Sequence, residues 1–111
     1  MDDQTALVAL CRVEDVTPDT PFKAELHGEP LAVFQIGDHY YVTQDSCTHG
    51  PGSLAEGYVD GEEIECPFHQ GRFDIRTGAA TGAPCTEPLR IWQVMVRDGT
   101  IWVNGAEHPP A

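Results

Sequence analysis

Cys47-Thr48-His49 and Cys66-Pro67-Phe68-His69, with residues 50–65 between them, are two short segments that each offer one thiolate and one imidazole. Two such pairs form the ligand set of a mixed-ligand binuclear iron–sulfur cluster, in which two cysteines hold one iron and two histidines hold the other. We therefore predict that Cys47 and Cys66 bind the inner iron of one [2Fe-2S] cluster, and that His49 and His69 bind the outer iron.

A single zinc ion is the main alternative for the same four residues. Zinc usually takes ligand pairs that are separated by two to four residues, whereas only Thr48 separates Cys47 from His49. The shorter spacing suits side chains that reach two different metal atoms. Flanking glycines at 50, 52 and 71 allow backbone N–H groups to approach a cofactor closely. The pattern favours iron, and a zinc-stabilised interaction domain is the competing hypothesis.

These segments resemble the two cluster loops of the Rieske family, and in particular its small ferredoxins from bacterial aromatic-ring dioxygenase systems. The resemblance rests on Cys-Thr-His-Gly at 47–50 and on Cys-Pro-Phe-His-Gln-Gly-Arg-Phe-Asp at 66–74, and it extends roughly from Leu7 to Val103. It implies one low-potential Rieske [2Fe-2S] cluster held by Cys47, His49, Cys66 and His69. It also implies an electron-transfer protein with no catalytic residues, which is a component of an oxidoreductase system and not itself an enzyme.

The resemblance implies two protein partners as well. A flavin-dependent ferredoxin reductase that uses NAD(P)H would supply single electrons, and a terminal ring-hydroxylating oxygenase of aromatic hydrocarbon catabolism would accept them. The alternative within the same family is a redox subunit or sensor of another oxidoreductase.

Two departures from the respiratory branch of the family bear on the reduction potential. The resemblance places Gly71 and Phe73 where that branch has a serine and a tyrosine that donate hydrogen bonds to cluster sulfur and to a ligand thiolate. Gly52 and Phe68 stand where it has two bridging cysteines. Donors to sulfur stabilise the reduced state, so their absence lowers the potential. We expect a midpoint potential near the bottom of the Rieske range, about −150 mV.

The charge balance narrows the class of partner. The 111 residues include 18 acidic and 6 basic ones, for a formal net charge of −12, and nucleic acid phosphates would repel such a protein. Acidic residues gather between the cluster segments at Glu56, Asp60, Glu62, Glu63 and Glu65. This stretch is either a docking face for basic protein surfaces or simply a solvated surface.

Nothing in the sequence indicates a membrane or an export route. No apolar run approaches the length of a membrane span, and the N-terminus lacks the basic start and apolar run of a secretory signal. We therefore expect a cytoplasmic protein without membrane contact. A monomer is the default expectation for an acidic electron carrier.

Short alternating segments joined by Gly and Pro turns predict an all-β fold. We expect strands at 7–13, 22–27, 31–36, 39–43, 63–65, 72–75, 91–96 and 100–103, with hairpin turns at 37–38 and 98–99. The resemblance implies a small antiparallel β sandwich or barrel with a cluster-binding subdomain. We expect one Rieske domain over 1–111, with a base at roughly 5–43 and 85–105 and the cluster-binding subdomain at roughly 44–84.

The other cysteines and histidines lack ligand spacing. Cys11 lies in an apolar run and is expected to be a small buried residue, and Cys85 is expected to pack in the proline-containing loop that covers the cluster in the resembling family. Surface positions are expected for His27, His39 and His108, and core positions for Trp92 and Trp102.

Overall fold

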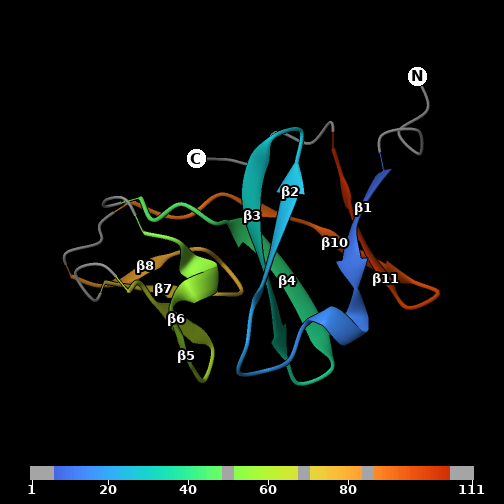
Figure 1. The fold of residues 1–111 in the computed structure, drawn as a ribbon. Helices are drawn as coiled ribbons and strands as arrows, with labels where there is room; N and C mark the ends of the chain where they lie inside the picture. The colour runs from blue at the N-terminus through green and yellow to red at the C-terminus, as the bar shows by residue number, and fades with distance from the viewer. Residues whose placement is uncertain (1–6, 49–51, 68–70, 84–86, 106–111) are drawn as a thin grey trace.

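The computed structural model describes residues 7–48, 52–67, 71–83 and 87–105, which form three antiparallel sheets (Figure 1). The strands are β1 (Leu7–Arg12), β2 (Phe22–Leu26), β3 (Glu29–Ile36), β4 (His39–Gln44), β5 (Tyr58–Asp60), β6 (Glu63–Glu65), β7 (Arg72–Asp74), β8 (Ala80–Gly82), β9 (Ile91–Trp92), β10 (Val94–Arg97) and β11 (Thr100–Asn104). The described residues also include the 3-10 helices η2 (Val13–Asp15) and η3 (Leu54–Glu56). The predicted all-β fold is confirmed as a sandwich-like arrangement, and the described strands do not close into a barrel.

The central sheet has the strand order β2-β3-β4-β9 and lies between the other two (Figure 1). The sheet β1-β11-β10 lies on one side of it, and the sheet β5-β6-β7-β8 lies on the other. Strand β3 is buried on both faces, because Leu31 and Val33 join one apolar core while Ala32 and Phe34 join the other. This explains its unbroken apolar run, which a strand with one wet face would not have.

Residues with a left-handed backbone conformation form the turns of two hairpins. In the β2–β3 turn, His27 and Gly28 have φ values of 51° and 85°, so β2 ends at Leu26, one residue earlier than expected. In the β10–β11 turn, Asp98 and Gly99 have φ values of 54° and 76°, and the predicted hairpin is confirmed. Consecutive positive φ values match the right-handed twist of the flanking strands.

The expected single strand at 91–96 is wrong. Strand β9 pairs with β4, with Trp92 opposite Val42, whereas β10 pairs with β11, with Val94 opposite Val103. The chain therefore passes from one sheet to another at residue 93, which the alternating pattern did not predict. The expected strands also omitted β5 and β8, which are only three residues long and carry little periodic signal.

The two tryptophans differ in burial. Trp92 is buried in the core between the central sheet and the β1-β11-β10 sheet, as predicted. Trp102 is only half-buried, because its neighbours Ile101 and Val103 take the inward positions of β11 and leave Trp102 on the outer face. Within the described residues, none of the helical segments has the length and apolar character needed to cross a membrane.

Gly57 allows a close approach between two segments of the β5–β8 region. A Cβ atom at this position would lie 2.3 Å from the carbonyl oxygen of Glu65 and 3.2 Å from that of Leu54. Both contacts are with backbone, which cannot swing aside as a flexible side chain could. Because Glu65 directly precedes Cys66, this glycine fixes the approach of the chain to the second cluster loop.

We expect Gly57→Ala to lower the free energy of unfolding by about 2–3 kcal/mol, since the overlap with backbone forces strands apart. Gly61→Ala is the matched control, because Gly61 has a φ of 63° with no atom within 4 Å of the added Cβ. It should cost only about 1 kcal/mol, for the left-handed backbone. Chemical unfolding of both variants gives the comparison, and equal losses would contradict the steric explanation.

Candidate metal centre

Cys47 and Cys66 begin two loops that are closed in the same way. The N–H of Cys47 donates a hydrogen bond to the carbonyl of Gly52 at 3.0 Å, and the N–H of Cys66 donates to the carbonyl of Gly71 at 2.7 Å. All four residues are buried. The two cysteines therefore occupy the same position relative to the hydrogen bond that closes each loop.

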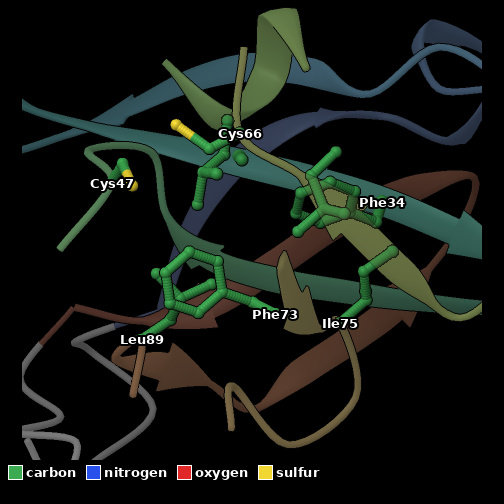
Figure 2. Packing of buried hydrophobic residues seen from close by; sticks show 9 residues of the cluster. Phe34, Cys47, Cys66, Phe73, Ile75 and Leu89 are labelled. Atoms are coloured by element: carbon green, nitrogen blue, oxygen red, sulfur yellow. The ribbon is translucent and has the colours of Figure 1, made fainter. Parts of the chain in front are cut away.

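Both thiols belong to one apolar cluster between the β5–β8 sheet and the central sheet. Cys66 is fully buried and Cys47 is 7% exposed. Figure 2 shows the two sulfur atoms at the same end of this cluster, with Phe34 and Ile75 toward the other end. The predicted outer ligands, His49 and His69, lie outside the described residues.

The donor set fits an iron–sulfur cluster. Thiolates are soft ligands that suit iron–sulfur centres, and two of them approach one end of an apolar cluster from separate loops. Apolar surroundings keep water from the metal and help to set its potential. Among the described residues, no three His, Cys, Asp or Glu side chains lie close enough to hold a metal ion together.

Two side chains attach the first loop to the segment that leads into β9. The Thr48 hydroxyl donates a hydrogen bond to the carbonyl of Glu87 at 2.9 Å. Gln44 accepts a bond from the N–H of Arg90 at its side-chain oxygen, at 2.8 Å, and its side-chain nitrogen donates to the carbonyl of Ser46 at 2.8 Å. These bonds fix the path of the chain immediately before and after Cys47.

Asp45 is a functional candidate that the sequence analysis missed. Its side chain is 3% exposed, two residues before Cys47, and its Oδ1 accepts a hydrogen bond from the N–H of Ala55 at 2.8 Å. Its Oδ2 lies 3.6 Å from the Nζ of Lys23. The available signal was a carboxylate directly after the strand at 39–44, where burying a charge costs free energy unless it has partners.

The acidic stretch between the loops is partly neutralised by two arginines. Arg72 forms ion pairs with Asp60 and Glu63, and Arg76 forms one with Glu62. The hydrogen bond to Asp60 raises the pKa of the Arg72 guanidinium above its usual value. The two arginines therefore offset part of the negative charge of the five carboxylates in this stretch.

Cys11 does not match its expected burial. It is only partly buried in β1, next to an irregularity in the pairing with β11. Burial, with a smaller effect of the Asp15 carboxylate, raises the pKa of the Cys11 thiol to about 11, so it stays protonated near neutral pH and is a poor metal ligand. His27 and His39 are exposed, as predicted. Cys85, His108 and Phe68 lie outside the described residues.

Comparison with known proteins gives a consistent result. The model of the protein family described as "Rieske [2Fe-2S] domain" matches residues 6–93 of this chain. Ferredoxin CarAc of Metapseudomonas resinovorans is 45% identical over 97 residues, which cover 86% of this chain and 91% of the relative. The ferredoxin component of the p-cumate 2,3-dioxygenase system of Pseudomonas putida is 45% identical over 109 residues, covering 96% and 92%.

A solved structure is similar along almost the whole chain. It is the complex of reduced oxygenase and oxidized ferredoxin in carbazole 1,9a-dioxygenase. The matching chain has a TM-score of 0.86 and 42% sequence identity, and the match covers 95% of this chain and 98% of that one.

Position 73 provides a test of the expected low potential, because Phe73 is fully buried in the same cluster as both thiols and has no hydrogen-bond donor in its side chain. We expect a wild-type midpoint of about −150 mV. Phe73→Tyr should raise it by roughly 40 mV, the one-electron equivalent of a net hydrogen bond of about 1 kcal/mol.

Phe34→Tyr is the matched control, since Phe34 lies toward the other end of the cluster (Figure 2). It should leave the midpoint nearly unchanged. Spectroelectrochemical titration of the three proteins measures the effect. A wild-type midpoint well above zero, or equal shifts in both variants, would show that missing donors do not set the potential.

Proposed function

The chain belongs to the Rieske [2Fe-2S] domain family, and from this we propose that it is the ferredoxin of an aromatic-ring dioxygenase system. The observation that carries the proposal is the match, over nearly the full chain, to relatives named as ferredoxin components. The protein carries a Rieske [2Fe-2S] cluster and transfers electrons, and it is not itself a catalytic enzyme.

We propose that Cys47 and Cys66 hold the inner iron, and that His49 and His69 hold the outer iron. The matching positions of the two cysteines in their loops, and the burial of both thiols, support the inner assignment. When bound, the cluster accepts and releases one electron at a time. The chain's own residues contribute fixed ligand positions, which keep rearrangement small when the charge changes.

The arrangement of the sheets supports a division of the domain into two parts. We propose one domain over 1–111, with a base at roughly 5–43 and 85–105 and a cluster-binding subdomain at roughly 44–84. The β5–β8 sheet lies within the second part, and the apolar cluster beneath it is shared with Ala32 and Phe34 of the base. The base is therefore a support against which the two loops are packed.

The partners follow from the same proposal. A flavin-dependent reductase that uses NAD(P)H would reduce the protein, and a terminal ring-hydroxylating oxygenase would oxidise it. The relative in the carbazole 1,9a-dioxygenase complex was solved together with its oxygenase. A net charge of −12 should steer the protein toward basic partner surfaces. We propose a cytoplasmic monomer, since a carrier with two partners must leave each of them.

Reconstitution tests this function. The reductase and oxygenase of the p-cumate and carbazole systems are mixed with this protein in place of their own ferredoxins, and product is measured against NADH oxidised. We expect product to form only when this protein is present, and its rate to fall as ionic strength rises, because salt screens the attraction between charged surfaces.

Protein without metal, refolded in chelator, is the control for simple contamination. The carrier role fails if product forms equally fast without this protein, or if the iron-loaded protein supports neither system. A colourless, zinc-containing preparation would favour the interaction-domain hypothesis instead.

A further inference from the structure

We propose that Asp45 is a positioning residue that holds together the two ends of the first cluster loop. Lys23, the only lysine of the chain, balances its charge. This inference rests on the proposed ligand set, because it assigns a role toward the cluster to residues that do not bind it.

The second loop shows what closure requires. Beyond Cys66 and Gly71, Glu65 pairs with Arg72 and Ile64 pairs with Phe73 in the β6–β7 ladder. Ile64 and Phe73 are both fully buried. A regular antiparallel ladder and an apolar pair therefore hold the two arms of this loop together.

The first loop has no such ladder. Beyond Cys47 and Gly52, its arms are joined by an isolated bridge between Ser46 and Ser53. One further bond follows, from the N–H of Leu54 to the carbonyl of Asp45 at 2.8 Å. The chain then turns into η3, so the arms separate and backbone pairing ends.

The Asp45 carboxylate replaces the missing pairing. The N–H groups at the start of a helix have no partner within it, and Ser53, which precedes η3, makes no side-chain capping bond. Instead, Asp45 Oδ1 accepts the N–H of Ala55 at 2.8 Å from the opposite arm. Asp45 thus occupies the position that Ile64 occupies in the second loop, and closes its loop with a charge-assisted bond in place of an apolar pair.

Burying the charge of that carboxylate costs free energy, and residues of strands β2 and β3 offset the cost. Asp45 is 3% exposed, its N–H donates to the carbonyl of Pro30 at 3.2 Å, and its Oδ2 lies 3.6 Å from Lys23 Nζ. Lys23 belongs to β2, so the pair connects the central sheet to the first loop. A buried charge is tolerated when it is both hydrogen-bonded and paired, as here.

The two charges should act on the cluster with opposite signs. Reduction adds one negative charge, so a nearby carboxylate disfavours it and a nearby ammonium favours it. Removing the charge of Asp45 should raise the midpoint potential, and removing the charge of Lys23 should lower it. A purely structural link between strands would not produce this pair of opposite shifts.

The experiment uses the iron-loaded protein and four variants: Asp45→Ala, Asp45→Asn, Lys23→Gln and, as control, Asp38→Asn, an exposed carboxylate in the β3–β4 turn at the opposite end of β4 from Asp45. Release of iron to a chelator and the midpoint potential are measured for each.

Asp45→Ala should release iron roughly tenfold faster or more, because the Ala55 N–H loses its partner in a buried site. Asp45→Asn keeps an acceptor oxygen and should rescue the release rate while raising the midpoint. Lys23→Gln should lower the midpoint, and Asp38→Asn should change neither quantity.

Chemical modification keeps the test decisive if Asp45→Ala does not fold. With one lysine, acetylation of the folded wild type removes the Lys23 charge and reductive methylation preserves it. Acetylation should lower the midpoint and methylation should not, while Lys23→Gln treated identically reports the contribution of the N-terminal amine.

Release of iron from Asp45→Ala at the wild-type rate, or shifts of the same sign at positions 23 and 45, would overturn the inference. Wild-type protein that binds no iron and sulfide would instead overturn the proposed function.

Discussion

Two buried thiols brought to one place from two separate loops are the constraint on which the rest of the structure depends. Cys47 and Cys66 share one apolar cluster, and each begins a turn closed by a hydrogen bond from its own N–H to a glycine carbonyl. Thiolates in apolar surroundings are costly unless a metal compensates their charge. The fold therefore holds together a site whose stability is linked to its cofactor.

The two loops meet this constraint by different means. The second loop continues a regular β6–β7 ladder, so local backbone pairing supports it. The first loop follows the long strand β4 and precedes a 3-10 helix, so polar contacts with distant segments support it. Lys23 of β2 pairs with Asp45, Gln44 accepts a hydrogen bond from the N–H of Arg90, and Thr48 donates one to the carbonyl of Glu87. The arms of the first loop thus depend on polar contacts with the base, whereas the second loop depends on its own sheet.

The parts of this structure that were predictable from sequence are those with local causes. The hairpin at Asp98-Gly99 follows from residues that tolerate positive φ, and the spacing of the cysteine–histidine segments predicted that Cys47 and Cys66 meet, as they do in one apolar cluster. The change of sheet at residue 93 was missed, because alternation continues across it while the pairing partner changes from β4 to β11.

Asp45 was missed for a related reason. Its partners, Lys23 and Ala55, are distant in sequence, and no pattern along the chain joins them. Trp102 was misplaced because a large aromatic residue on a hairpin suggests a core position, yet Ile101 and Val103 already occupy the inward face of β11. In each case a tertiary contact, and not local preference, decided the outcome.

The central claim is a binuclear iron cluster held by thiolates at one end and imidazoles at the other. Anomalous diffraction recorded above and below the iron edge, on crystals of the protein as purified and at a resolution that separates neighbouring metal atoms, tests it most directly. We predict two iron peaks, one beside the sulfur atoms of Cys47 and Cys66 and one beside the ring nitrogens of His49 and His69. A single metal peak bound by all four side chains, or a peak that persists below the iron edge, would contradict the account.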